Sequence, residues 1–304
     1  PQRMHIGQSY KLLEFLLWTR RNIYWLFVIG AIPTILYQVL QWKWIALPWT
    51  VVALLGTATA FIVGFKNTQT YSRTWEARQI WGSILNSSRA WGIMCRDYMD
   101  DVKASKELIY RHFAWLTALR YQMRESKAWE STHKVYNKEY MAYYSIPEKE
   151  STLELELAKY IPAEEVLQIM ATRNKAVQLL GLQSKAIKEL YDQGILDNFR
   201  FLEMHKLITT LYDHQGKSER IKNFPYPRQF ATVSSMFVKL FCIMLPFSML
   251  KDFDKLNENI GGIMQGQMVW LVIPFSMLIS WVYTSLEQVG ESTENPFEGS
   301  ANDV

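Results

Sequence analysis

Cysteine is almost absent from this chain of 304 residues, and its charges nearly balance. The two cysteines, Cys95 and Cys242, lie far apart, so we expect no disulfide framework, and a reducing compartment is compatible. The formal net charge is only +4 and no basic stripe carries interleaved aromatics, so we expect no nucleic-acid partner. The start of the chain is polar, and no small-residue cleavage site follows its first apolar run. We therefore expect no cleaved secretion signal.

Motifs for catalysis are also missing. The five histidines show no metal-ligand spacing, no Gly-rich phosphate loop follows a strand, and no nucleophile elbow occurs. Strand-like alternation is nowhere convincing. We therefore predict that the protein is not an enzyme, and we expect no metal and no cofactor.

Long uncharged runs are what the sequence does contain. They cover residues 23–40, 45–65, 230–250 and 260–286, with Lys239 the only charge inside the third run. Each run can span a bilayer core, and in lipid such segments must be helical because their backbone groups need internal partners. With 49% hydrophobic residues and a mean hydropathy of −0.09, the chain also needs a large aqueous part. The predicted fold is an all-α membrane protein with four transmembrane helices and a large helical cytosolic domain.

Basic residues predict the orientation of the spans. Arg20 and Arg21 precede the first run, and Lys66, Arg73 and Arg78 follow the second. Cytoplasmic flanks carry an excess of such residues, so both flanks are predicted to be cytoplasmic, as are both termini.

The predicted organisation has five parts. They are an N-terminal interfacial helix, the first two spans, the helical cytosolic domain, the last two spans and a polar cytosolic tail, over residues 1–22, 23–65, 66–228, 229–286 and 287–304. Within the cytosolic part, apolar residues recur at helical spacing, while residues 126–160 are the least regular and indicate a loop or insertion. Pro162 is expected in the first turn of a helix, and the prolines of 224–227 predict a break between helices.

One stretch, residues 54–92, passes from an uncharged half to a half rich in Arg, Trp, Asn and Ser. Its second half contains Gly64-Phe65, Asn67, Tyr71-Ser72-Arg73, Trp75-Glu76-Ala77-Arg78, Trp81-Gly82 and Asn86-Ser87-Ser88-Arg89. In these residues it resembles the bestrophin family, in particular the prokaryotic branch. The resemblance extends over nearly the whole chain. It implies a homopentamer around a central pore, in the inner (plasma) membrane of a bacterium, that conducts small monovalent ions passively.

Thr57, Phe61 and Phe65 follow i, i+4, i+8 spacing and fall near one face of the second span. In an arbitrary membrane helix such a stripe is more often a lipid-facing or core stripe. Repeated around a cyclic oligomer it forms stacked apolar rings, which can gate a pore by dewetting. The resemblance implies that these three residues form the pore neck. The family usually has an apolar residue where this chain has Thr57, so we expect a wetter outer end of the neck, or a Thr57 that points away.

A second constriction, the cytosolic aperture, is implied at Ile195, in a segment that resembles the family's aperture region. The alternative is ordinary burial of an isoleucine before a helix. The other signature residues are expected to be scaffold for the neck helix and the subunit contacts: Arg73, Trp75, Glu76, Arg78, Trp81 and Arg89. Within this group, Glu76 and Arg78 suggest an ion pair on a helix surface or at a subunit interface rather than an acid/base pair.

Two further features bear on function. An ammonium within a span is costly unless it faces a cavity, a partner or the interface. For Lys239 we favour snorkelling or a subunit contact over electrostatic tuning of a vestibule. Animal bestrophins bind calcium through an acidic run after the fourth span, but here that run is reduced to Glu298 and Asp303, which argues against calcium activation.

The sequence therefore predicts a bestrophin-like ion channel whose partners are its own copies, the lipid bilayer and permeant monovalent ions. Apolar rings carry no charge, so the choice between chloride and sodium stays open. The alternative is a membrane-anchored helical sensor or scaffold without conduction. A secondary transporter is a weaker rival, because the four runs show no clear inverted repeat and no paired broken helices.

Overall fold

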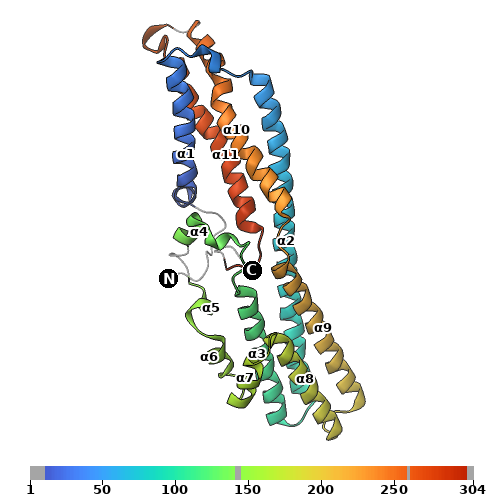
Figure 1. The fold of residues 1–304 in the computed structure, drawn as a ribbon. Coiled ribbons are helices and arrows are strands. Elements are labelled where there is room, and N and C mark those ends of the chain that lie inside the picture. The colour runs from blue at the N-terminus through green and yellow to red at the C-terminus, as the bar shows by residue number, and fades with distance from the viewer. Residues whose placement is uncertain (1–10, 141–144, 259–260, 300–304) are drawn as a thin grey trace.

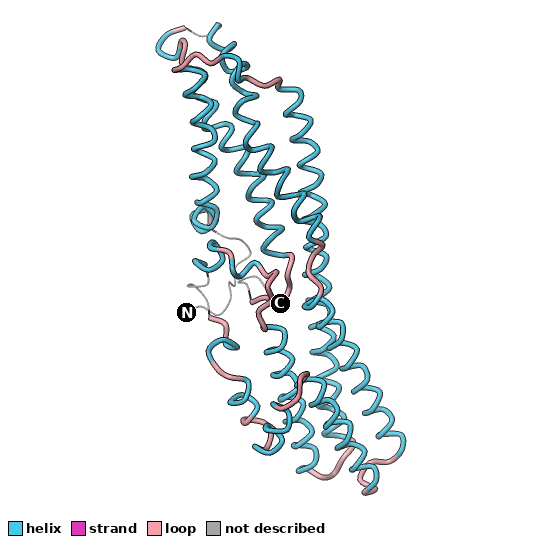
Figure 2. Tube along the Cα trace, viewed as in Figure 1, coloured by secondary structure: helices cyan, strands magenta, loops and turns pink. Residues whose placement is uncertain are grey.

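The computed structural model describes residues 11–140, 145–258 and 261–299, and every regular element within them is helical (Figures 1 and 2). The molecule is elongated, with one helical bundle at each end of a long shared helix. The longer helices are α1 (Leu12–Gln38), α2 (Trp49–Asp97), α3 (Val102–Arg124), α8 (Lys175–Asp192), α9 (Asn198–Asn223), α10 (Arg228–Lys255) and α11 (Val272–Thr293). The shorter ones are α4 (Val135–Tyr140), α5 (Pro147–Glu150), α6 (Leu153–Leu157) and α7 (Ala163–Met170).

Helix α2 is the shared element. It contains 49 residues without a break, which at about 1.5 Å per residue is roughly 74 Å. Pro48 is its N-cap, where the missing N–H costs nothing. The second predicted span and the start of the cytosolic domain are therefore one continuous rod, and the change from apolar to charged sequence at residues 64–67 occurs without a turn.

The first bundle contains the apolar helices. Three segments of the described part are long and apolar enough to cross a membrane, namely Lys43–Asp97, Arg228–Glu258 and Met268–Thr293. Helix α1 packs against α10 and α11, but it is not one of the three candidate membrane spans. It ends at Gln38, so its uncharged part is shorter than the predicted run 23–40. The fourth crossing therefore stays a prediction.

In the second bundle, α3 and α9 pack against the charged half of α2, and α8 packs against α3 and α9 (Figure 1). Its core includes the fully buried indoles of Trp91 and Trp115. Trp115 Nε1 donates to Gln215 Oε1 at 2.9 Å, which fastens α3 to α9. This core therefore contains two of the 12 tryptophans of the chain.

Proline marks the element boundaries largely as predicted. Pro162 is the N-cap of α7, one position before the first turn in which it was expected. Helix α9 ends at Asn223 and α10 begins at Arg228, so the predicted break at 224–227 is confirmed. The irregular region 126–160 contains only helices of six residues or fewer in its described part.

The segment after residue 286 differs from the expected polar tail. Helix α11 continues to Thr293, and Glu287, Gln288 and Gly290 on it are buried. Phe297 is completely buried, with a left-handed backbone (φ 72°), and its ring meets that of Trp81 edge-on. The polar composition of this segment was misleading because two of its carboxylates, Glu287 and Glu291, form ion pairs with Lys66 and Lys134. The predicted tail is part of the junction between the two bundles.

The predicted boundary at residue 22 also falls inside an element, because α1 runs without interruption from Leu12 to Gln38. The first ten residues of the predicted interfacial helix lie outside the described part of the chain.

Candidate functional site

Thr57, Phe61 and Phe65 lie on one exposed face of α2. Phe61 is 78% exposed and Phe65 is 53% exposed, although both are large apolar side chains. The opposite side of the helix is buried against α10 and α11, through residues that include Val52 and Val63. A single chain thus leaves this stripe uncovered, which is the geometry that stacked rings in an oligomer require.

A close helix crossing fixes which way this face points. Gly56 lies against Phe241 of α10, where an added Cβ would be only 2.7 Å from the ring. Tyr283 of α11 donates its hydroxyl to the Gly56 carbonyl at 3.2 Å. Because both neighbours meet the same residue of α2, the helix cannot rotate without losing these contacts. Thr57 and Phe61 are therefore directed away from α10 and α11, while Phe65 stays half exposed with its ring centroid 6.1 Å from that of Phe230 on α10.

The hydroxyl of Thr57 is partly satisfied by the helix itself. Thr57 Oγ1 donates to the Ala53 carbonyl at 3.0 Å. The side chain thus uses its donor internally and presents its methyl group and acceptor lone pairs to the outside. The Thr57 side chain is therefore less polar than the residue type alone suggests.

Buried charge begins directly after Phe65. Lys66 is 2% exposed, and its Nζ lies 2.7 Å from Oε1 of Glu287 on α11. Ser234 of α10 donates its hydroxyl to Oε2 of the same carboxylate at 2.5 Å. Three helices thus meet at one ion pair beside the inner end of the stripe. Sequence reasoning missed this cluster, although the lone charges that follow two uncharged runs, Lys66 and Glu287, are the signal that could have found it.

Arg73 connects three helices through hydrogen bonds to backbone carbonyls. Its Nε donates to the Glu294 carbonyl at 3.1 Å, and Nη2 donates to the Phe224 carbonyl at 2.7 Å. Its neighbour Thr74 donates to the Thr293 carbonyl at 2.9 Å. These bonds hold the ends of α9 and α11 against α2, and they satisfy carbonyls that the helix termini leave free.

The remaining signature residues lie on several sides of α2. Glu76 pairs with Arg220 of α9, so it does form a helix-surface ion pair, but with a residue outside the signature. Trp75 is half exposed and stacks on Tyr71, with ring centroids 6.4 Å apart. Trp81 packs against the core of the second bundle. Arg78 and Arg89 are exposed.

The segment that matches the calcium-binding region of animal bestrophins has a structural role. Glu298 accepts hydrogen bonds from the Ser131 backbone N–H at 2.9 Å and from its hydroxyl at 2.6 Å, so both carboxylate oxygens are engaged. Among the described residues, no group of three or more His, Cys, Asp or Glu side chains is placed to hold a metal ion. Asp303 lies outside the described residues.

Ile195 lies in the turn between α8 and α9. It is half-buried and packs against the core of the second bundle, and its N–H donates to the Leu190 carbonyl at 3.0 Å. Arg200 donates to the Tyr98 carbonyl at 3.0 Å, which places this turn at the far end of α2. Phe199, in the first turn of α9, is 80% exposed and is a second aperture candidate that sequence reasoning did not single out.

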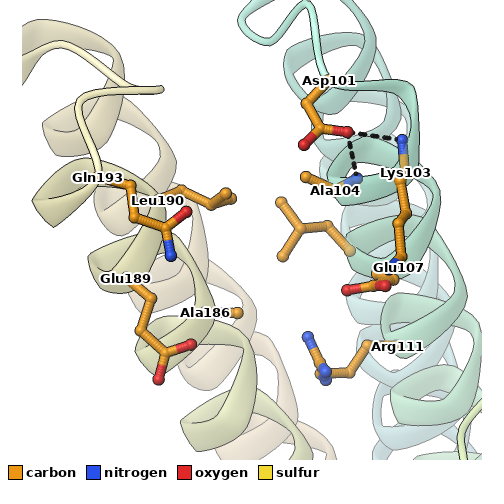
Figure 3. Close-up of a pocket in the computed structure, with 10 residues that line it drawn as sticks. Asp101, Lys103, Ala104, Glu107, Arg111, Ala186, Glu189, Leu190 and Gln193 are labelled. Carbon is orange, nitrogen blue, oxygen red and sulfur yellow. Dashed lines mark hydrogen bonds between the residues drawn. The ribbon is translucent and has the colours of Figure 1, made fainter.

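A cleft of about 240 Å³ lies behind this turn, between the start of α3 and the end of α8 (Figure 3). Asp101 caps α3 through the N–H groups of Lys103 and Ala104 at 2.9 and 3.1 Å. Arg111 forms an ion pair with Glu165 at 2.7 Å. Asp101 therefore caps α3, and Arg111 connects α3 to α7 through Glu165.

The two candidate constrictions are far apart. From Phe65 to the end of α2 at Asp97, the helix rises by about 48 Å. The two candidate positions therefore lie at opposite ends of the charged half of α2.

A family model of bacterial and fungal bestrophins matches residues 20–304. This chain belongs to the bestrophin family. The resemblance seen in residues 54–92 is thereby confirmed. The bestrophin also shares its fold with the crystal structure of a bacterial bestrophin homolog from Klebsiella pneumoniae, with a TM-score of 0.77, 24% identity, and coverage of 94% of this chain and 91% of that one.

Curated relatives of this bestrophin carry a functional name. The voltage-dependent anion channel-forming protein YneE of Escherichia coli K12 is 25% identical over 252 residues, which are 83% of this chain and 70% of the relative. A protein of the same description from Ralstonia nicotianae is 25% identical over 255 residues, with the same two coverages.

Proposed function

We propose that this bestrophin is a passive channel for small monovalent ions, formed by five copies around one axis in a bacterial inner membrane. The observation that carries the proposal is the outward-facing apolar stripe of α2. Phe61 and Phe65 are exposed in a single chain, and Gly56 and Tyr283 fix the rotation that exposes them. Repeated by cyclic symmetry, the stripe becomes stacked rings that can gate by dewetting.

In this proposal the chain crosses the membrane four times, with α1 as the first crossing, and both termini are cytoplasmic. Helices α3 to α9 and the charged half of α2 form the cytosolic domain. The Thr57, Phe61 and Phe65 rings form the neck, and the turn at Ile195 forms the cytosolic aperture about 48 Å further along α2. Arg73, Glu76 and the Lys66–Glu287 pair hold the neck helix in place.

For the ion sign we propose anions. The curated relatives are named as anion channel-forming proteins. The exposed stripe of α2 itself carries no carboxylate that would favour cations, and the exposed residues around its inner end are neutral: Gly64, Thr68, Gln69 and Ser72.

The neck assignment is tested by Phe61→Ala in purified protein reconstituted into planar bilayers. Removing the aromatic ring widens and wets the constriction, so the single-channel conductance should increase. Phe27→Ala is the matched control, because Phe27 is an exposed aromatic residue on α1, away from the proposed pore. Equal conductance in Phe61→Ala and wild type would show that this face does not line the path.

The aperture is tested by comparing Ile195→Ala with Phe199→Ala. If Ile195 forms the constriction, its truncation should alter conductance and the Phe199 variant should not. The reverse result would place the aperture at Phe199. If neither variant changes the conductance, the segment between α8 and α9 does not line the pore.

The rival function is a membrane-anchored scaffold whose helical domain binds a partner. The mass of the detergent-solubilised particle separates the two. A pentameric mass supports the pore, and a monomeric mass contradicts it because one copy cannot enclose an axis.

A further inference from the structure

Lys239 lines a cavity of about 240 Å³ among the inner ends of the apolar helices. Asn22 and Trp25 of α1, Ser235 of α10 and Gln288 of α11 also border it, as does Tyr136 of α4, a helix that packs against α1. The cavity thus lies where α1, α10 and α11 meet α4. Trp25 is 42% exposed, in keeping with the preference of tryptophan for the membrane interface.

The carboxylates of this cavity are already neutralised by other cations. Glu287 is paired with Lys66 at 2.7 Å. Glu291 is paired with Lys134 at 2.6 Å and accepts the hydroxyl of Tyr136 at 2.7 Å. Neither carboxylate is therefore available as the counter-charge of Lys239.

Lys239 itself is exposed, and no carboxylate of residues 11–140, 145–258 or 261–299 lies within 4 Å of its ammonium group. Besides Lys239, two arginines next to the cavity add to its positive charge. Arg20 and Arg21, just before Asn22, share the single carboxylate of Glu139, with 2.6 Å contacts to each of its oxygens. The surroundings of the cavity are therefore net positive.

An unpaired ammonium within a membrane helix needs a counter-charge. At this depth the inner leaflet supplies phosphate groups, and basic pockets between transmembrane helices on the cytoplasmic side bind such headgroups. Ile243, one turn above Lys239 on the same face of α10, is 44% exposed and gives an acyl chain an apolar surface. We propose that this cavity binds the phosphate headgroup of an anionic inner-leaflet phospholipid, with Lys239 as its counter-charge.

The test is native mass spectrometry of the detergent-purified particle, titrated with phosphatidylglycerol or with phosphatidylcholine of the same acyl chains. The wild type should retain phosphatidylglycerol in preference. Lys239→Gln should weaken phosphatidylglycerol binding about five-fold per site, the factor expected for one lysine near an anionic surface. Lys251→Gln, an exposed lysine near the opposite end of α10, is the matched control and should bind as wild type does.

Several results would overturn the proposal. They are unchanged phosphatidylglycerol binding in Lys239→Gln, an equal loss in Lys251→Gln, or equal retention of both lipids by the wild type. If the Lys239→Gln particle has a smaller mass than the wild-type particle but binds lipid equally well, Lys239 belongs to a subunit contact instead. Displacement of the lipid by millimolar inorganic phosphate would make free phosphate the occupant. Lipid binding requires the membrane placement of α10 but not conduction, so this inference and the channel fail separately.

Discussion

At the scale of single residues, His112 is a buried imidazole that cannot easily be protonated. It is 3% exposed, lies between Trp91 and Trp115, and neither ring nitrogen has a hydrogen-bond partner. Burial lowers the pKa of His112 from 6.5 to about 4. The unfolded chain therefore binds this proton at higher pH than the folded protein does, and acidification favours unfolding.

The folded protein should consequently lose stability as pH falls from 6.5 towards 4, by about 3 kcal/mol from this group alone. His112→Phe should make the thermal midpoint of the detergent-solubilised protein less sensitive to acid over that window. His205→Gln, at an exposed histidine, is the control. Parallel pH profiles for His112→Phe and wild type would rule out His112 as the source.

The Lys66–Glu287 pair is the second residue-scale feature with a measurable consequence. Both side chains are at most 9% exposed, so removing one partner strands a charge in a poorly hydrated place. Lys66→Met should cost about 3–5 kcal/mol of stability, and Lys66→Met combined with Glu287→Leu should recover most of it. Thermal unfolding of the two variants and wild type checks this, with the exposed Lys159 replaced by Met as control. A double variant no more stable than the single one would show that the charge is not the cause.

At the scale of elements, Gly56 sets the distance between α2 and α10. A methyl group there would lie 2.7 Å from the Phe241 ring, so the ring must move or the helices must separate. Gly56→Ala should therefore lower stability by about 1–3 kcal/mol and disturb the exposed stripe of α2. Gly216→Ala on α9 meets no atom within 4 Å and should not destabilise the protein. If both alanines behave alike in thermal unfolding, Gly56 is not a close-packing position.

The sequence predicted the elements better than their limits. The uncharged runs at 45–65 and 230–250 and the proline break at 224–227 all correspond to features of the structure, because apolarity and proline act locally. The continuity of α2 across residues 64–67 was harder to foresee, since a change of composition usually marks a change of element. The segment after residue 286 was misjudged for a different reason. Its charges pair with residues far away in sequence, such as Lys66, which is 221 positions from Glu287.

For the candidate site too, the sequence predicted local geometry but not the packing between helices. The i, i+4, i+8 spacing of Thr57, Phe61 and Phe65 correctly put them on one helix face, because helix geometry determines it. Which side of the helix is free depends on the close approach of Phe241 to Gly56, and the sequence does not encode that contact locally. The exposure of Phe199 beside the half-buried Ile195 likewise depends on how α8 and α9 pack.

At the scale of the whole molecule, one continuous helix connects an apolar bundle to a helical cytosolic bundle, and ion pairs and carbonyl clamps tie the two together at their junction. We propose that copies of this chain place the exposed face of α2 around a common axis and let anions pass. The most direct test is the reversal potential of purified protein in planar bilayers with asymmetric potassium chloride. If the channel conducts anions, the currents should reverse near the chloride equilibrium potential. Reversal near the potassium potential would contradict the anion assignment, and no current above that of protein-free bilayers would contradict the channel itself.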